Sequence, residues 1–211
     1  MIKVGYIDDK PVQFENYQRK LRREGIELIA FEISREKSNY LDQIYQHQVE
    51  ALLIDYKMVE SIGYNGSTLI SYISDEIPDI TCFILTAAES RDITDKLVAE
   101  AQIYSKEVFD TEAGAADRKK KFRKFVDHVK DCAEVFQNRR EIKCSEYVKL
   151  LKKRETKEGL SAKEEEEFCR LYKCLSSYGM VEKLPNKFLQ SDFDRKLDSL
   201  LEQGAAILQQ K

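Results

Sequence analysis

The segment VGYIDDK, residues 4–10, decides the fold, because it is a short apolar run that ends on two carboxylates, Asp8 and Asp9. Three later apolar runs, residues 51–54, 81–85 and 101–105, also end on a polar side chain, and these side chains are Asp55, Thr86 and Lys106. Short apolar runs separated by helical patterns predict the buried strands of a parallel α/β sheet. Ligands of such sheets bind beyond the carboxyl ends of the strands, so we expect these five side chains to converge.

Amphipathic helical patterns alternate with the strands. Residues 11–24 place Phe14, Tyr17 and Leu21 at helical spacing, residues 26–31 read as a second, more mixed strand, and residues 38–47 read as a helix. Further helices are predicted through residues 69–73 and through residues 93–98, where Ser90 or Asp92 can serve as the N-cap. Five βα units in this order predict a flavodoxin-like, doubly wound five-stranded parallel sheet with the strand order 2-1-3-4-5.

The second part of the chain is predicted to be all-helical. A basic amphipathic helix begins at Asp117, and its apolar pattern leaves open whether it continues past Asn138. A capping box formed by Ser161 and Glu164 predicts the start of another helix, and a last helix is predicted over residues 193–201. We therefore divide the chain into an α/β domain, residues 1–136, and a helical output or interaction region, residues 137–211.

The composition indicates a globular, heavily charged protein, with 42% hydrophobic and 35% charged residues and a formal net charge of -3. The first residues do not follow a signal-peptide pattern, and no apolar stretch approaches the roughly 18 residues that would span a bilayer. We expect a cytoplasmic protein without a membrane partner. The cysteines number five and are scattered, which is typical of reduced thiols, and Cys169 and Cys174 have no histidine nearby to complete a zinc site.

The five polar side chains at the strand ends form a chemically coherent set. Asp8, Asp9 and Asp55 offer the carboxylate oxygens that Mg²⁺ prefers, and without a cation these groups would repel one another. A carboxylate can also attack phosphorus and form an acyl phosphate. Thr86 could then donate a hydrogen bond to a phosphoryl oxygen, and Lys106 could pair with its charge. The set predicts a site for Mg²⁺ and a phosphoryl group.

Four motifs carry a resemblance to a known family: VGYIDDK, ALLIDYKM, CFILTA and IYSKE, in this order. With them, residues 1–136 resemble the receiver domain of bacterial two-component response regulators. The resemblance implies that Asp55 accepts a phosphoryl group from a histidine kinase or a phosphotransfer protein. It also implies that Asp9 and Asp55 ligate Mg²⁺ directly, that Asp8 acts largely through water, and that the backbone carbonyl of Lys57 completes the ligands. Thr86 and Lys106 would contact the phosphoryl group.

The chain departs from the family pattern at two positions near Lys106. Glu107 stands where the family usually has a proline in a cis peptide bond. Ile103 stands where the family usually has an aromatic residue, and Tyr104 follows it. These differences put in doubt an aromatic switch coupled to Thr86, but they do not affect phosphoryl transfer.

We interpret the chain as a Mg²⁺-dependent response regulator that accepts a phosphoryl group. We do not expect it to be an enzyme, apart from self-phosphorylation from small donors and slow self-dephosphorylation. Its helical region would bind a protein partner or a second copy of the chain. One alternative is a DNA-binding regulator with a divergent helical domain, although Glu164 and the three glutamates after it would repel DNA. Another is a scaffold with a receiver fold that is never phosphorylated. No histidine follows His128, which excludes a histidine phosphotransfer domain in the helical region.

Overall fold

The computed structural model describes residues 1–87, 97–110, 116–156 and 159–182. Its contacts divide the chain into two units, Met1–Arg139 and Arg140–Lys211. The division falls three residues after the boundary expected from the sequence. The predicted helix over residues 93–98, with its cap at Ser90 or Asp92, begins outside the described residues. The predicted helix over residues 193–201 lies wholly outside them.

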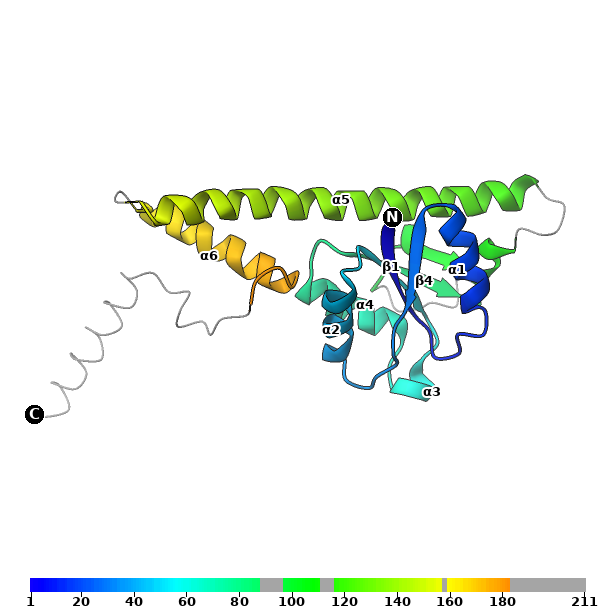
Figure 1. Ribbon diagram of the computed structural model, residues 1–211. Helices are drawn as coiled ribbons and strands as arrows, with labels where there is room; N and C mark the ends of the chain where they lie inside the picture. Colours follow the sequence, from blue (N-terminus) through cyan, green and yellow to red (C-terminus); the bar gives the residue numbers. More distant parts are fainter. Residues whose placement is uncertain (88–96, 111–115, 157–158, 183–211) are drawn as a thin grey trace, which may run out of the picture. The chain divides into compact units, whose positions relative to one another are not determined.

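The first unit is built on a five-stranded sheet whose strands are all parallel (Figure 1). The strands are β1 (Ile2–Ile7), β2 (Ile26–Ala30), β3 (Ala51–Asp55), β4 (Thr81–Thr86) and β5 (Ile103–Ser105). Their order in the sheet is β2-β1-β3-β4-β5, which confirms the predicted flavodoxin-like topology. The central strand β3 is buried along its whole length, as expected of a parallel sheet that is covered on both faces.

Helices cover both faces of this sheet. Among its described residues, the helical elements of the first unit are α1 (Phe14–Arg23), α2 (Ser38–His47), α3 (Val59–Ile62), α4 (Gly66–Glu76), the 3₁₀ turns η2 (Glu100–Gln102) and η3 (Lys106–Phe109), and the first part of α5 (Ala116–Arg154). α1 and α5 lie on one face, and α2 and α4 lie on the other (Figure 1). The one-turn helix α3 was not predicted from the sequence.

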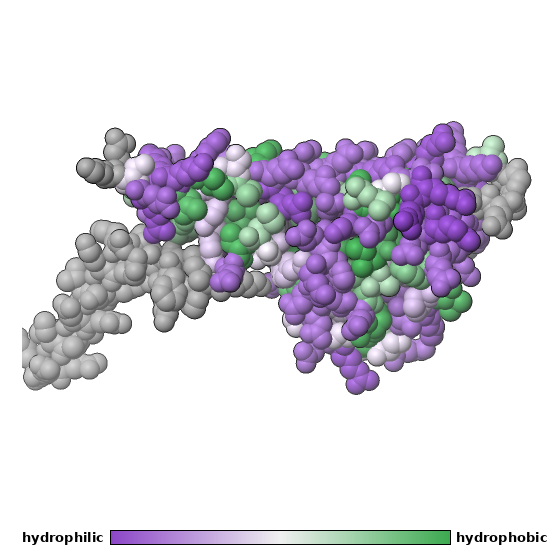
Figure 2. Space-filling view, in the orientation of Figure 1, coloured by the Kyte–Doolittle hydropathy of each residue, from purple (hydrophilic) through white to green (hydrophobic). Residues whose placement is uncertain are grey.

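The main core lies between the sheet and the α1–α5 layer. Phe109 and Phe125 are fully buried there, and their ring centroids are 5.5 Å apart. Tyr17 of α1 stacks on Phe109 with the ring centroids 4.0 Å apart. In the space-filling view, the outer surface over α1 and over the part of α5 in this unit is mostly hydrophilic (Figure 2). This division of apolar and polar faces is what the helical spacing in the sequence predicted.

Helix α5 is continuous over 39 residues, which answers the question left open at Asn138. Buried residues hold it on the sheet as far as Phe136, and Arg139 forms an ion pair with Asp79 at 3.0 Å. Asparagine is only a moderately poor helix former, so these contacts on either side of Asn138 are sufficient to carry the helix through it.

The second unit contains the end of α5 and helix α6 (Ala162–Ser177), which pack together as a helical hairpin. The ring of Tyr147 on α5 stacks on that of Phe168 on α6, with centroids 4.9 Å apart. The capping box at Ser161 and Glu164 is present, as predicted, and Lys153 also contacts Glu164 at 2.6 Å. The prediction of a helical C-terminal region is therefore confirmed. No helix in the described part of the chain is long and apolar enough to cross a membrane.

Gly66, the first residue of α4, packs closely against the backbone at the end of β3. Its N–H donates to the carbonyl of Tyr56 at 2.9 Å, and a Cβ at this position would lie 2.1 Å from the backbone oxygen of Asp55. We expect Gly66→Ala to lower the free energy of unfolding by about 1–3 kcal/mol, because β3 and α4 would have to separate. Urea denaturation measures this. Ser74→Ala, exposed on the same helix, is the control and should change it by less than about 0.5 kcal/mol. An equal effect of both variants would contradict the prediction.

Candidate functional site

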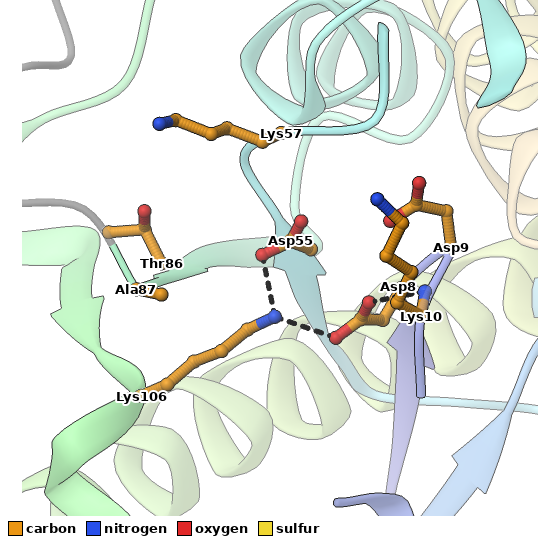
Figure 3. A pocket seen from close by; sticks show the side chains of 8 residues that line it. All are labelled: Asp8, Asp9, Lys10, Asp55, Lys57, Thr86, Ala87 and Lys106. Atoms are coloured by element: carbon orange, nitrogen blue, oxygen red, sulfur yellow. Dashed lines mark hydrogen bonds and ion pairs between the residues drawn. The ribbon is translucent and has the colours of Figure 1, made fainter. Parts of the chain in front are cut away.

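The strand topology brings the five predicted side chains to one edge of the sheet. Asp8 and Asp9 follow β1, Asp55 and Thr86 are the last residues of β3 and β4, and Lys106 directly follows β5. Adjacent parallel strands are paired so that their carboxyl ends coincide, with Ile7 opposite Ile54 and Asp55 opposite Leu85. All five residues line one open cavity of about 310 Å³, together with Lys10, Lys57 and Ala87 (Figure 3).

The Lys106 ammonium lies between two carboxylates and contacts both. Its Nζ is 2.8 Å from Asp8 Oδ2 and 2.8 Å from Asp55 Oδ1 (Figure 3). Both carboxylates are buried, so little water screens these ion pairs. The ammonium of Lys106 is thus shared by two carboxylates, and the carboxylate of Asp9 is a third negative charge at the same site.

Asp8 is the more strongly held of the two carboxylates. Besides Lys106, it accepts hydrogen bonds from the hydroxyl of Tyr6 at 2.5 Å and from the N–H of Lys10 at 2.8 Å. Burial by itself disfavours the charged form, but the bonds from Lys106, Tyr6 and Lys10 outweigh burial and lower the pKa of Asp8. Asp8 is therefore a fixed negative charge in the site.

Asp55 has the opposite balance. Burial is the largest effect and raises the pKa of Asp55 above its ordinary value, and the nearby charges of Asp8 and Asp9 add to this, while the bond from Lys106 opposes it. Burial also disfavours the charged form of Lys106, but its bonds to Asp55 and Asp8 prevail and raise the pKa of the ammonium. Asp55 is thus a carboxylate whose negative charge is under-compensated, which suits a group that gains from a cation or from covalent modification.

Asp8, Asp9 and Asp55 could hold a metal ion. Each offers one carboxylate oxygen, and these oxygens lie within 4.8 Å of one another. Three carboxylates facing one ammonium form a donor set that fits a hard divalent cation such as Mg²⁺, which prefers oxygen ligands. Asp9 is the most accessible of the three, and it accepts a hydrogen bond from Ser61 Oγ on α3.

The remaining predicted residues also lie at this site. Thr86 is buried, with 2% of its surface exposed, and its neighbour Ala87 lines the cavity. Lys57 lines the cavity too, while its side chain extends away from the carboxylates (Figure 3). The role expected for its backbone carbonyl remains a prediction.

Three participants were not singled out from the sequence. Tyr6 could have been found, since it lies two residues before Asp8 and alternate residues of a strand share a face. The N–H of Lys10 belongs to the turn after β1, whose shape the sequence pattern does not specify. Ser61 depends on the short helix α3, for which the sequence carries no periodic signal.

The structure shows what Glu107 and Tyr104 contact near the two departures from the family pattern. The N–H of Glu107 donates to Ser105 Oγ at 3.2 Å, a bond that a proline could not make. The hydroxyl of Tyr104 lies 2.6 Å from Nδ1 of His128 on α5, and its ring packs against Phe125. Tyr104 therefore faces the α5 layer and is a structural link between β5 and α5.

No family model matches the chain, and no curated protein matches it either. Solved structures do match. TrrA of Thermotoga maritima, a response regulator in complex with Mg²⁺ and beryllofluoride, is 21% identical, with 59% of this chain and 98% of that chain covered and a TM-score of 0.44. The response regulator StyR is 16% identical, with 89% and 80% covered and a TM-score of 0.48.

A third match is RcsB from Salmonella enterica serovar Typhimurium, bound to the promoter rprA in the presence of phosphomimetic BeF3⁻. It is 17% identical, with 86% of this chain and 94% of that chain covered and a TM-score of 0.42. Other matches are receiver domains, so the solved structures come from the family that the sequence motifs resemble. At these identities the likeness concerns the fold, and an assignment of function has to rest on the site itself.

The opposite pKa shifts of Asp8 and Asp55 predict opposite effects on stability. Asp8→Asn should lower the free energy of unfolding at pH 7 by about 1–3 kcal/mol, because it removes a charged acceptor from Lys106. The pKa of Asp8 is lowered in the folded state, so this difference should be present above the ordinary pKa of about 3.9 and disappear as the pH falls through the folded-state value.

Asp55→Asn should leave the free energy of unfolding at pH 7 unchanged or raise it, because burial of the ionised carboxylate opposes folding above its raised pKa. Both variants are compared by urea denaturation in metal-free buffer. Equal destabilisation by the two substitutions would contradict this account of the site.

Proposed function

We propose that the first unit is a receiver domain that accepts a phosphoryl group on Asp55 in a Mg²⁺-dependent reaction. The observation that carries the proposal is the position of Lys106, 2.8 Å from both Asp8 and Asp55, beside a third carboxylate on Asp9. A structural ion pair would need only one carboxylate for one ammonium. Three carboxylates with oxygens within 4.8 Å of one another need positive charge beyond the Lys106 ammonium, and a divalent cation supplies it.

The reaction follows from the chemistry of these residues. One carboxylate oxygen of Asp55 attacks phosphorus, a P–O bond forms, and the bond to the donor breaks, which for a histidine kinase is a P–N bond whose electron pair stays on the imidazole. Asp8, Asp9 and Asp55, with the carbonyl of Lys57, would hold Mg²⁺, which neutralises charge on the transferring group. Lys106 would follow the negative charge from the carboxylate to the new phosphoryl oxygens, and the Thr86 hydroxyl would donate to one of them.

The output belongs to the helical region in this proposal. Phosphorylation would move Lys106, which follows β5, and the Tyr104–His128 bond joins β5 to α5. Helix α5 then continues to Arg154 and pairs with α6 in the second unit. We therefore expect a change at Asp55 to alter binding of a protein partner or of a second copy through this region.

Labelling by a small phosphodonor tests the chemical part of the proposal. Incubation with acetyl phosphate and Mg²⁺ should add one phosphoryl group to the wild-type chain, measured as intact mass. Asp55→Asn should abolish the labelling, because the amide is not a nucleophile, and chelation of Mg²⁺ should do the same. Stoichiometric labelling that persists in Asp55→Asn would refute the assignment of the phosphoacceptor.

The oligomeric state tests the output. Size-exclusion chromatography with light scattering, in Mg²⁺, should show a change in mass on addition of beryllofluoride, and Asp55→Asn should lose that change. An unchanged mass, with beryllofluoride still bound, would contradict self-association and point to another protein as the partner. Salt-dependent binding of duplex DNA would instead favour the DNA-binding alternative, and failure to bind Mg²⁺ and beryllofluoride would favour the unphosphorylated scaffold.

A further inference from the structure

The short helix α3 contacts the loop that carries Asp9. Ser61 Oγ donates a hydrogen bond to Oδ2 of Asp9, although the two residues are 52 positions apart in the sequence. The adjacent Glu60 lies 3.9 Å from Lys10 Nζ, and both of these side chains are largely exposed. The exposed ion pair contributes little. The hydrogen bond from Ser61 is also exposed, but its acceptor is a candidate metal ligand.

The position of Ser61 is set by its neighbours in α3. Met58 is fully buried and Ile62 is nearly so, which anchors the helix on the core at both ends. The N–H of Ser61 donates to the carbonyl of Met58 at 3.1 Å. Gly63 ends the helix in the left-handed region, with φ +90°, where a glycine is favoured. Ser61 is itself exposed, so its position is set by the backbone of α3 and not by packing of its side chain.

The three carboxylates of the candidate metal site differ in how they are held. Asp8 and Asp55 both contact Lys106, whose positive charge repels a metal ion bound to the same carboxylates. Asp9 is held through Ser61, a neutral donor that occupies Oδ2 and leaves Oδ1 able to serve as a ligand. Carboxylates that ligate metals are commonly fixed by such hydrogen bonds from a second residue, and removal of the second residue typically weakens metal binding 10- to 100-fold.

We propose that Ser61 is a positioning residue for the divalent cation: it fixes the carboxylate of Asp9 so that Asp9 can serve as a ligand alongside Asp8 and Asp55. The inference rests on the proposed function in taking Mg²⁺ as the cation. It adds that α3 is a functional part of the site, since the hydroxyl is useful only where the buried anchors Met58 and Ile62 place it.

Ser61→Ala should weaken Mg²⁺ binding roughly 10-fold. Without the hydroxyl, the side chain of Asp9 would have to be ordered when Mg²⁺ binds, and this would lower the affinity. Ser61→Thr keeps the hydroxyl at an exposed position and should bind Mg²⁺ as the wild type does. Mg²⁺ should also slow hydrogen exchange at the α3 amides of Ser61, Ile62 and Gly63 in the wild type, and should slow it less in Ser61→Ala.

The test is calorimetric titration of the full chain with Mg²⁺, with hydrogen exchange measured on the same samples. Glu60→Gln is the matched control, because it changes the neighbouring residue of α3, removes the contact with Lys10 and leaves the bond to Asp9 intact. It should bind Mg²⁺ as the wild type does. Urea midpoints in metal-free buffer should be the same for all variants, which separates positioning from folding.

Two results would overturn the inference while leaving the proposed function in place: equal Mg²⁺ affinity of Ser61→Ala and the wild type, or equal weakening in Ser61→Ala and Ser61→Thr, which would show that the hydroxyl is not the cause. Absence of Mg²⁺ binding by the wild-type chain would overturn the inference and the proposed function together.

Discussion

The rest of the site depends on the Lys106 ammonium, which stands 2.8 Å from the carboxylates of both Asp8 and Asp55. Two buried carboxylates this close would otherwise repel each other and take up protons. Burial raises the pKa of Asp55, and the bond from Lys106 does not offset it. Asp8 has the additional donors Tyr6 and Lys10, and with Lys106 they lower its pKa despite burial. This asymmetry separates a fixed charge from a reactive one, although both residues are aspartates at neighbouring strand ends.

The parallel sheet is what makes this interaction available. Strand pairing aligns the carboxyl ends of β1, β3, β4 and β5, so residues up to 98 positions apart meet without any special loop. On the other side of β5, Tyr104 contacts His128, which places a structural link two residues from Lys106. A change of charge at Asp55 would therefore act on a lysine whose strand is joined to α5, the helix that leads into the second unit.

The sequence predicted the sheet, because an apolar run that ends on a polar residue marks the carboxyl end of a buried strand. For the same reason it predicted the convergence of Asp8, Asp9, Asp55, Thr86 and Lys106. It did not predict α3, since four residues are too few to show a helical period. For that reason it also missed Ser61, whose contact with Asp9 depends on where α3 is anchored. The continuity of α5 through Asn138 could not be predicted either. It depends on the burial of Phe136 and on the ion pair between Arg139 and Asp79, which are contacts between distant segments.

The central claim is that Asp55 receives a phosphoryl group in a site completed by a divalent cation, and ¹⁹F NMR of beryllofluoride binding tests it most directly. We expect a bound fluoride signal from the wild-type chain that requires Mg²⁺ and is absent in Asp55→Asn, because the complex mimics a phosphoryl group on the ionised carboxylate. A bound signal that persists in Asp55→Asn, or that forms without a divalent cation, would contradict the account.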